Sequence, residues 1–553
     1  MRTVLVRPSN SRGSLYLTKM GFLPVPVGLL QLAASIRTVA GNQVFIIDME
    51  ADKLTMEETV ARTLSLKPDL VGITIHATAS YNSARQLMLR LKEEKHDLKV
   101  IVGGHHATFL PESIIRDGFD IVALGEGDET IRELVSVLES GASSVNVRGI
   151  VFRDGDRIIR TAPRPLISDL DSLPLPSLDL VDREKYQIRT FGTNETVVCL
   201  ETSRGCPYAC DFCSVTPTWG YRRRYKSNAR IIAEMEMAKR AGYDWIFFTD
   251  DIFILPQNLD QRRKLFSSIA DSGPDIRWLA QMRADVIARN PDIIPAAVMA
   301  GFRVAAIGVE SGSREVLKKM RKSIRASDTV AAIRALDENG VVVLLSFMIG
   351  APYERFMDML STVRLAVRLA GAGADVVQFT IYTPLPGTAI FRQALEEDTI
   401  FTLDWDRFDF LTPVMKTMVH PSVIQAIQYF ALYSFYLRRY LATGGGRSGL
   451  AWPKSDLLPT AIRFILSDKS DYVRDALALP GELIHTALLY TSLSGSRPDE
   501  HARAEMLSES DAPIYAGRNQ RQVRRQEAQA GSAASSSAAS QLIADQKLAY
   551  IHH

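Results

Sequence analysis

The chain has 553 residues, 46% of them hydrophobic and 23% charged, with a formal net charge of +2. This is the composition of an ordinary globular protein, and the length predicts two to four domains. The small net charge argues against a nucleic-acid-binding surface spread over the whole protein, so no nucleic-acid partner is expected. Four cysteines, three of them in one motif, do not make a disulfide framework, which predicts a reducing cytoplasm.

The N-terminus shows no signal peptide, because Thr3–Arg7 has the pattern of a buried strand. No stretch reaches about 18 uninterrupted apolar residues, so no membrane-spanning helix is expected. We therefore expect a cytoplasmic protein, with peripheral contact at the inner face of the membrane left open.

Residues 1–145 alternate short apolar strands with amphipathic helices. The expected strands are Thr3–Arg7, Gln43–Asp48, Leu70–Ile75, Lys99–Gly103 and Ile121–Leu124. The expected helices are Val27–Ala40, Met56–Leu66, Ser80–Glu94 and Pro111–Asp117. This alternation predicts an α/β domain with a doubly wound, Rossmann-like parallel sheet, which binds ligands at the carboxyl ends of its strands.

Three glycine-containing loops lie at those carboxyl ends: Gly72–Thr74, Gly103–Thr108 and Gly125–Thr130. Glycine lets the backbone approach a flat or phosphorylated ligand closely. The tight turns of any doubly wound domain explain the same glycines equally well.

Residues 146–193 are expected to form a hairpin and a linker. The hairpin spans residues 149–161 and turns at Asp154-Gly155. The prolines of Asp169–Pro176 keep that segment extended, as in an interdomain linker.

Residues 194–395 carry a second series of strand–helix units. The expected strands are Glu195–Glu201, Trp245–Thr249, Ile276–Gln281, Val304–Val309, Val342–Met348 and Val376–Tyr382. The expected helices are Asn228–Ala241, Asp260–Asp271, Pro291–Ala300, Ala326–Asn339 and Met357–Gly371. Six such units predict a (β/α)6 partial TIM barrel, with its active site at the carboxyl ends of the strands.

A cysteine motif follows the first strand of this series. Cys206, Cys210 and Cys213 are spaced C-x3-C-x2-C, and the fourth cysteine, Cys199, lies within the strand. Thiolates suit iron–sulfur clusters or zinc, but structural zinc usually has four ligands in two separated pairs. A [4Fe–4S] cluster normally takes four thiolates, so three leave one iron open to a small molecule.

Residues 396–493 are expected to be helical, and residues 494–553 turn charged and Ala/Ser-rich, which predicts a disordered tail. Further apolar helices are expected at Leu457–Ile465 and Pro480–Tyr490. The predicted helix Ile424–Leu441 carries an aromatic stripe with Arg438 and Arg439 near its end. The stripe could pack on the barrel, border an apolar substrate channel, or meet a membrane surface through the arginines.

Over residues 1–395 the chain resembles the cobalamin-dependent radical S-adenosylmethionine (SAM) family, which includes hopanoid methylases and the anaerobic magnesium-protoporphyrin ester cyclase. The C-x3-C-x2-C motif, with Phe212 before its last cysteine, carries the resemblance to radical SAM enzymes. The N-terminal domain, its glycine loops and the Asp169–Pro176 linker carry the resemblance to the cobalamin branch. The family implies three cofactors: a [4Fe–4S] cluster, SAM and cobalamin.

The resemblance also assigns site residues. The cluster ligands are Cys206, Cys210 and Cys213. The SAM-binding residues are Phe212, Asp250, Asp251, Gln281, Arg283, Glu310, Ser311, Gly350 and Tyr382. The cobalamin-binding residues are Thr74, Gly103, Gly104, His105, Thr108, Gly125 and Glu126. Helix capping by the residues after the second and fourth strands, and a structural ion pair at Arg283, are the competing interpretations.

The chain departs from the cobalamin pattern at one point. The motif D-x-H-x-x-G is absent, because the loop after the first strand reads Arg7-Pro-Ser-Asn-Ser-Arg-Gly13. We therefore expect no histidine on the cobalt. His105 and His106 are the substitutes to consider, although loop histidines more often form hydrogen bonds or lie at the surface.

In this family the reduced cluster cleaves SAM to a 5′-deoxyadenosyl radical, and methylcobalamin supplies a methyl group. The resemblance thus implies a carbon methyltransferase acting on an apolar, lipid or other large natural-product substrate, with an electron donor of the flavodoxin or ferredoxin type. Two alternatives stay open: a radical SAM cyclase or oxidative enzyme of the same architecture, and a non-catalytic iron–sulfur or zinc protein.

Overall fold

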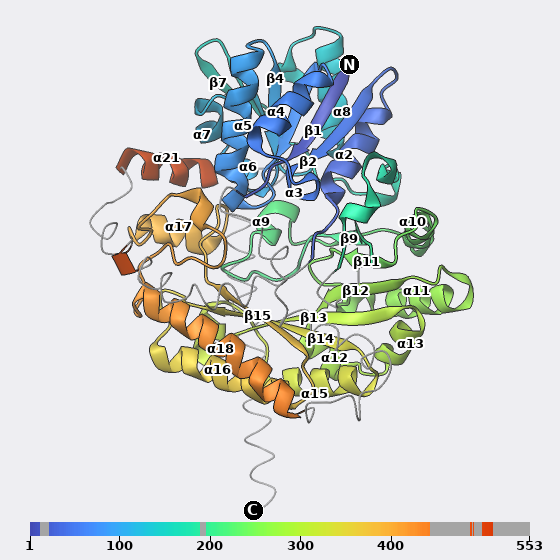
Figure 1. Cartoon of the computed structure of the whole chain (residues 1–553), viewed down its shortest axis with the longest axis vertical. Coiled ribbons are helices and arrows are strands. Elements are labelled where there is room, and N and C mark those ends of the chain that lie inside the picture. The colour runs from blue at the N-terminus through green and yellow to red at the C-terminus, as the bar shows by residue number, and fades with distance from the viewer. Residues whose placement is uncertain (11–21, 189–194, 443–486, 489, 491–499, 512–553) are drawn as a thin grey trace, which may run out of the picture.

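The computed structural model describes residues 1–10, 22–188, 195–442, 487–488, 490 and 500–511. Within these residues the chain forms two parallel α/β units, one above the other in Figure 1, with a helical C-terminal part against the second. The expected fold class is confirmed.

The first unit is built on a seven-stranded sheet of order β2-β1-β3-β4-β5-β6-β7. Its strands are β1 (Arg2–Arg7), β2 (Gln43–Asp48), β3 (Leu70–Thr74), β4 (Lys99–Gly103), β5 (Ile121–Ala123), β6 (Ile150–Asp154) and β7 (Arg157–Arg160). The first five are parallel, and β6 and β7 extend the sheet as an antiparallel hairpin. The predicted hairpin therefore extends the sheet of the first unit.

Helices cover both faces of this sheet. They are α2 (Val27–Arg37), α3 (Met49–Asp52), α4 (Met56–Ser65), α5 (Tyr81–Glu94), α6 (His105–Phe109), α7 (Pro111–Arg116) and α8 (Asp128–Glu139). Alternate residues of β1 enter different cores: Leu5 packs in the core with α2 and α8, while Val4 and Val6 pack in the core with α5. Successive strand side chains point to opposite faces, so a strand buried on both sides must be apolar throughout.

The second unit is a six-stranded parallel sheet of order β15-β14-β13-β12-β11-β8. Its strands are β8 (Val197–Leu200), β11 (Trp245–Phe248), β12 (Arg277–Met282), β13 (Phe302–Glu310), β14 (Val342–Ile349) and β15 (Val376–Ile381). Its helices are α10 (Asn228–Arg240), α11 (Leu259–Ser272), α12 (Ala284–Arg289), α13 (Ile293–Met299), α14 (Arg314–Lys319), α15 (Ala326–Glu338), α16 (Phe356–Gly371) and α17 (Ala389–Glu396). Among the described strands β8 and β15 do not pair, so the barrel is partial, as predicted.

The inner face of this sheet is closed near the amino ends of the strands and accessible above them. Phe22 and Ile188 pack there against inward-facing residues such as Trp245. Further along the strands, Gln281 is exposed, and the Gln378 amide donates to Ser346 Oγ at 2.9 Å. The polar side chains of the inner face thus lie toward the carboxyl ends of the strands.

A short ribbon and helix lie between the two units. The ribbon pairs β9 (Ser203–Arg204) with β10 (Arg224–Tyr225), and α9 (Val215–Trp219) lies just below the first unit in Figure 1. The described part of the linker forms short 3-10 turns at Leu170–Ser172, Leu178–Leu180 and Arg183–Lys185.

Helix α18 (Pro421–Ala442) packs against α16 and β15. Its buried face is aliphatic with one aromatic ring: Ile424, Ile427, Ala431, Leu432 and Phe435. Its exposed face carries Phe430, Tyr433, Leu437 and Tyr440. The aliphatic face therefore forms most of the contact with the barrel, and of the predicted aromatic stripe Tyr436 joins it through its hydroxyl, 3.4 Å from the Val377 carbonyl oxygen of β15.

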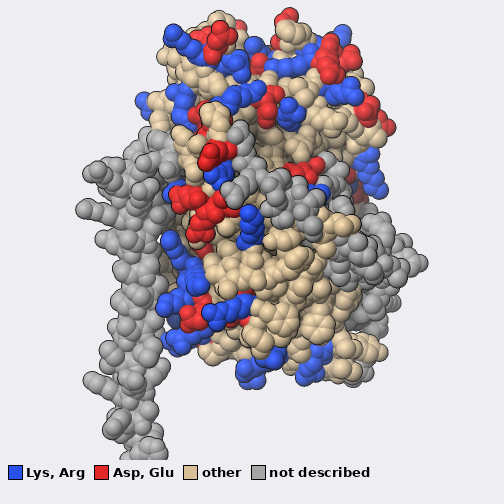
Figure 2. Space-filling view, turned by 90° about the vertical axis from the view of Figure 1, so that its left-hand side faces the viewer, with Lys and Arg blue, Asp and Glu red and all other residues tan. Residues whose placement is uncertain are grey.

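The two arginines of α18 have different surroundings. Arg439 is buried and pairs with Asp375 at 2.5 Å, so it cannot meet lipid head groups; Arg438 is exposed. Figure 2 shows uncharged residues over much of the lower half of the face that it presents. Phe356 of α16 and the α18 residues Val423 and Phe430 line an apolar groove of about 650 Å³. In the described part of the chain, no helix is both long and apolar enough to cross a membrane.

Helix α21 (Glu500–Asp511) lies within the stretch that the sequence predicts to be disordered. It packs against α7 and α17, and the Glu509 carboxylate accepts the backbone N–H groups of Glu112 at 3.1 Å and Ser113 at 3.0 Å. The disorder prediction is wrong for these residues, because a distant part of the fold supplies the contacts that local composition lacks. The helices predicted at Leu457–Ile465 and Pro480–Tyr490 lie outside the described residues, except for three positions of the second.

Candidate functional site

The cysteine loop begins directly after β8 and β9, at the carboxyl edge of the partial barrel. The Thr216 hydroxyl closes it by donating to the carbonyl oxygens of Tyr208 at 2.7 Å and Cys206 at 3.3 Å. Gly205 adopts φ +98°, and a Cβ there would lie 2.8 Å from a carbonyl oxygen. The turn into the loop therefore requires glycine.

The loop brings its three thiols together. Cys210 raises the pKa of both Cys206 and Cys213 through its charge, in addition to the larger effect of burial. Burial raises the pKa of Cys206 to about 11. Cys199 lies elsewhere: it is buried within β8, near Arg7 and Tyr243. Cys206, Cys210 and Cys213 thus form one set, and Cys199 is not part of it.

This donor set fits an iron–sulfur cluster better than a single ion. Nowhere in the described ranges do three His, Cys, Asp or Glu side chains converge at the spacing of one metal ion. A cubane cluster spreads its ligands over several irons, and thiolates are its usual ligands. Without a bound metal the raised pKa values keep the three thiols protonated, and metal binding would deprotonate them.

Asp211, between two of the cysteines, fastens the loop to the far side of the barrel. Its backbone N–H donates to the Met320 carbonyl at 3.4 Å, and its carboxylate accepts the Tyr353 hydroxyl at 3.3 Å. Burial raises the pKa of Asp211 to about 6. The Phe212 ring meets the Tyr382 ring edge-on at 6.1 Å. Tyr382 is buried in this packing, so the structure gives it a supporting position beside the loop.

Asp250 and Asp251 follow β11 and have different surroundings. Asp250 is 1% exposed, and its carboxylate accepts the Thr202 N–H at 2.8 Å and the Thr202 hydroxyl at 2.6 Å. Arg223 and Arg262 also pair with it. Asp251 is only partly buried, and burial together with the Asp250 charge raises its pKa to about 7. Its charge also raises the pKa of Cys206, which places Asp251 beside the cysteine loop.

Glu310 ends β13 in a left-handed conformation, with φ +64°. The β13–β14 register shifts between Gly308 and Glu310, and the Glu310 carboxylate pairs with Lys322. A Cβ on Gly308 would lie 2.4 Å from that carboxylate, so Gly308 makes room for the pair. Lys322 also lowers the pKa of Cys210, so this charged pair lies near the cysteine loop. Ser311 is buried, and its hydroxyl shares a hydrogen bond of 3.1 Å with the Thr362 hydroxyl. This contact gives Ser311 a structural role.

Three other predicted SAM residues lie at the ends of barrel strands or directly after them. Gln281 is exposed on the inner face. Arg283 pairs with Asp285 at 2.9 Å and lies over the Tyr208 ring at 3.8 Å, so it combines a structural ion pair with contact to the cysteine loop. The Gly350 N–H donates to the Glu354 carboxylate at 2.7 Å and is therefore already engaged.

The predicted cobalamin residues lie together at the carboxyl edge of the first sheet. The Thr108 hydroxyl donates to the Gly104 carbonyl at 2.8 Å and accepts the Gly125 N–H at 3.1 Å, which ties the β4 and β5 loops to each other. Gly104 adopts φ +109°, and a Cβ there would lie 2.5 Å from the Ile75 carbonyl. Gly103 and Thr74 end β4 and β3. The edge thus presents small residues and backbone to a ligand.

The two edges face each other. His105, after β4, contacts α9 of the cysteine segment: its Nδ1 lies 3.0 Å from Thr218 Oγ1, and its ring lies 6.0 Å from the Trp219 ring. His106 instead points into the first unit, between the rings of Tyr81 and Trp405. A ligand on the first sheet would therefore face the cysteine loop.

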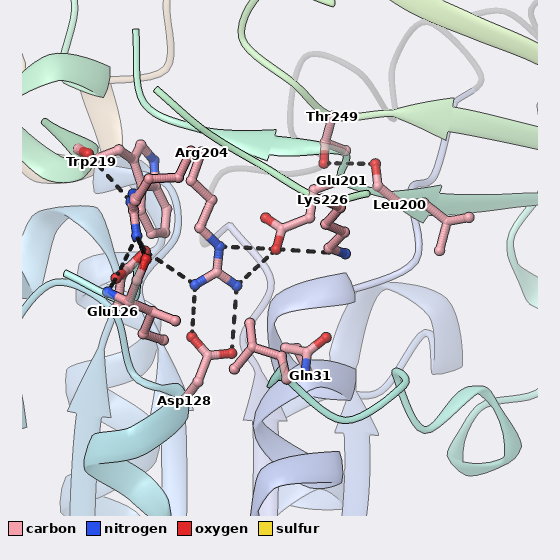
Figure 3. Close-up of polar contacts among 12 residues, drawn as sticks. Gln31, Glu126, Asp128, Leu200, Glu201, Arg204, Trp219, Lys226 and Thr249 are labelled. Carbon is pink, nitrogen blue, oxygen red and sulfur yellow. Dashed lines mark hydrogen bonds and ion pairs between the residues drawn. The ribbon is translucent and has the colours of Figure 1, made fainter. Parts of the chain in front are cut away.

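Buried charges fasten this arrangement (Figure 3). Arg204, two residues before the first cysteine, reaches Asp128 at 2.9 Å, Glu126 at 3.2 Å and Glu201 at 2.8 Å. Arg224 reaches Glu126 at 2.7 Å. Glu126 and Asp128 belong to the first unit, Glu201 follows β8 of the second, and Arg204 and Arg224 lie in the ribbon between the two units. We call these five residues the interdomain clamp; in it Glu126 anchors the two units instead of lining a ligand site.

Comparison with known proteins decides the family. Residues 13–135 match the model of a B12 binding domain, and residues 200–366 match that of the radical SAM superfamily. An uncharacterized methyltransferase of Pyrococcus horikoshii is 33% identical over 442 residues, which cover 79% of this chain and 93% of that protein. The chain belongs to the cobalamin-dependent radical SAM family.

Two further relatives agree. The hopanoid C-3 methylase of Methylococcus capsulatus is 26% identical, over 75% of this chain and 76% of that protein. The cobalamin-dependent SAM radical enzyme OxsB, solved with aqua-cobalamin and SAM bound, superposes with a TM-score of 0.63 at 16% identity. That match covers 92% of this chain and 83% of OxsB and shows the shared fold. As a member of this family the chain is an enzyme whose cofactors are a [4Fe–4S] cluster, SAM and cobalamin.

Sequence reasoning missed several residues of this cobalamin-dependent radical SAM site. Lys322 lies twelve residues beyond its partner Glu310, and Arg204 lies 76 residues beyond Asp128, so no local motif joins them. His76, two residues after β3, is exposed at the cobalamin edge, and its ring lies 5.5 Å from that of His105. Its place just beyond a predicted strand end was the available signal.

Proposed function

We propose that this enzyme methylates an unactivated carbon of an apolar or large substrate, such as a lipid or natural product. The observation that carries the proposal is that the cysteine loop and the small-residue edge of the first sheet face each other across His105 and α9, where His105 Nδ1 lies 3.0 Å from Thr218 Oγ1. Chemistry at either cofactor would then share one space with the same substrate.

The inner face of the barrel supports an apolar substrate. Phe247, Leu279 and Leu344 are partly buried there and offer hydrocarbon surface. Gln281, Ser346 and Gln378 lie further along the strands and could orient a polar end. Sites of this kind bind through apolar contact and take specificity from a few polar groups.

Each cofactor-facing residue has a role that its surroundings allow. Cys206, Cys210 and Cys213 would hold the cluster, leaving one iron for the amino acid part of SAM. Asp251 would accept the SAM ammonium, because the Asp250 carboxylate is already saturated. Lys322 and Arg283, which both lower the pKa of Cys210, are the cations near enough to meet the SAM carboxylate.

When bound, the cluster and the corrinoid supply the electron and the methyl group, while the protein's part is to orient the substrate and exclude water and oxygen. Electron supply requires a reduced partner, for which we propose a flavodoxin- or ferredoxin-type donor in a reducing cytoplasm. Neither a small flavoprotein nor an iron–sulfur carrier needs a deep binding site, because electron-transfer contacts are small and transient.

The test is anaerobic incubation of the reconstituted enzyme with SAM carrying an isotopically labelled methyl group, a reductant and an extract of the source cells. Methyl transfer predicts label in an extracted product, together with 5′-deoxyadenosine and S-adenosylhomocysteine. Formation of 5′-deoxyadenosine with an unlabelled, ring-closed or oxidised product would favour the cyclase alternative. Cys210→Ala is the control, and any product that it still forms does not come from radical chemistry.

A further inference from the structure

His76 stands at the point of the first sheet where ligands bind in open α/β folds. The strand order β2-β1-β3-β4 reverses direction between β1 and β3. Such a switch point opens a crevice at the carboxyl ends of the two strands. β3 ends at Thr74, and His76 is the exposed side chain that follows.

The other two histidines of this edge are occupied. His105 Nδ1 is 3.0 Å from Thr218 Oγ1, and the ring packs near Trp219. His106 is 2% exposed, with its Nδ1 3.4 Å from Thr78 Oγ1 and rings on either side. Turning the Nδ1 atom of either ring toward a ligand would break these contacts. Among the three histidines of this edge, His76 is the one whose side chain is exposed.

The groups around His76 favour a neutral ring. Arg7 lies near it, and the His105 ring meets it at 5.5 Å with an angle of 64° between the planes. Although the side chain is exposed, the protein atoms around it partly desolvate the ring, and this effect, followed by the Arg7 charge, lowers the pKa of His76. Arg7 itself is fixed by Asp48 at 2.5 Å and by the Pro24 carbonyl at 2.7 Å, so it does not compete for the ring. A neutral imidazole is the form that binds metals.

We propose that His76 faces the corrinoid and ligates its cobalt through an imidazole nitrogen. The inference rests on the assignment of cobalamin to this edge. The step is a dative bond: the nitrogen lone pair enters an axial position and displaces water or the cobalamin's own benzimidazole, with no change in oxidation state. His76 thus replaces the histidine of the missing D-x-H-x-x-G motif from a different loop. This differs from the histidine-free cobalt expected from the sequence.

Ligation by His76 would change the reactivity of the cobalt. An axial nitrogen changes the electron density available to a cobalt–carbon bond, and the ring that carries it is oriented by a second group, here His105. His76 would thereby be a positioning residue for methyl transfer.

The test is electron paramagnetic resonance of the full-length enzyme loaded with cobalamin and reduced to Co(II), with the cluster kept in its oxidised, diamagnetic state. Nitrogen from an axial ligand splits each cobalt line into a triplet. Enzyme carrying histidine labelled with nitrogen-15 should show a doublet instead, which separates a protein nitrogen from that of the cobalamin base. His76→Ala should lose the doublet, while His105→Ala should keep it.

Three results would overturn the proposal: unsplit lines in the unmodified enzyme, a triplet that the label does not change, or a doublet that survives His76→Ala. For each variant, the cobalamin content is measured by absorbance after gel filtration, so that loss of the ligand can be distinguished from loss of the cobalamin. Bound cobalamin without a histidine doublet refutes this ligand and leaves the proposed function standing. An enzyme that retains no cobalamin at all refutes both.

Discussion

Asp250 and Asp251 are neighbours in the chain, yet the fold gives their carboxylates different surroundings. The Asp250 carboxylate accepts two hydrogen bonds from Thr202 and pairs with Arg223 and Arg262, whereas Asp251 is partly exposed beside the cysteine loop. A buried carboxylate with several cations is a structural group, because removing its charge leaves those cations unpaired.

Asp251→Asn should fold normally and bind SAM about tenfold to a hundredfold more weakly, since a charge-assisted hydrogen bond to an ammonium contributes about 1.5–3 kcal/mol. Asp250→Asn should instead lower the free energy of unfolding by about 3–5 kcal/mol, because Arg262 would be left buried without its counter-charge. Equilibrium dialysis with SAM and thermal unfolding distinguish the two effects. Equal loss of SAM affinity in both variants, without loss of stability, would contradict the assignment.

The cysteines allow a second test with a matched control. Cys206→Ala, Cys210→Ala and Cys213→Ala should each abolish the visible absorbance of the reconstituted cluster. Cys199→Ala should keep that absorbance, because Cys199 is buried within β8 and faces Arg7 and Tyr243. This control costs about 1 kcal/mol of stability for the cavity that it creates. An intact cluster in any of the first three variants would remove that residue from the ligand set.

At the scale of elements, the strands could be predicted because each is an apolar run bounded by turn residues. β2 and β4 begin and end at the predicted residues, and the other predicted strands of the two sheets differ by one or two residues at an end. What could not be predicted depends on distant contacts. Composition alone cannot show that Glu509 docks on α7, or that α18 packs on the barrel mainly through its aliphatic face and leaves Phe430, Tyr433 and Tyr440 exposed.

The site shows the same division. Local spacing predicted the three cysteines and the position of each strand-end loop. It could not separate Glu126, held by Arg204 and Arg224, from the ligand-facing residues of its own loop. A charge partner that lies tens of residues away leaves no local pattern, so its role becomes visible only in the fold.

A buried carboxyl group, that of Glu354, holds the backbone of the loop after β14. Glu354 is 0% exposed, and its carboxylate accepts the N–H groups of Gly350 at 2.7 Å and Ala351 at 3.2 Å. Burial raises its pKa from 4.5 to about 7. As pH rises from 4.5 to about 7, the unfolded chain loses this proton before the folded protein does, so stability falls over that window and then levels off.

Glu354→Gln should remove this loss, because the amide oxygen can still accept both N–H groups and carries no charge. The variant should match the unmodified enzyme at pH 4, below both pKa values, and exceed it at pH 8 by about 3 kcal/mol, since each pKa unit corresponds to about 1.4 kcal/mol. Thermal unfolding across this pH range measures the difference, with the exposed Glu338→Gln as control. Parallel pH profiles for Glu354→Gln and the unmodified enzyme would refute the assignment.

At the scale of the whole molecule, the interdomain clamp determines how the two cofactor edges sit. Arg204 and Arg224 hold Glu126 in a region that is almost fully buried, and Arg204 lies only two residues from Cys206. The neighbouring charges, led by Asp128, raise the pKa of Arg204 despite its burial, so the guanidinium stays charged. Buried ion pairs often contribute little net stability, but they specify one arrangement, and breaking them is costly.

Glu126→Gln should therefore lower the free energy of unfolding by about 3–5 kcal/mol and loosen the two units relative to each other. The second effect is measured by pulsed electron paramagnetic resonance between Co(II) and the reduced cluster. The unmodified enzyme should give one narrow distance distribution, and Glu126→Gln a broader one with both cofactors still bound. The control is Glu236→Gln, which breaks the exposed Arg240–Glu236 pair and should change stability by less than about 0.5 kcal/mol. A distribution as narrow in Glu126→Gln as in the control would mean that other contacts, such as His105 with α9, set the distance between the cofactors.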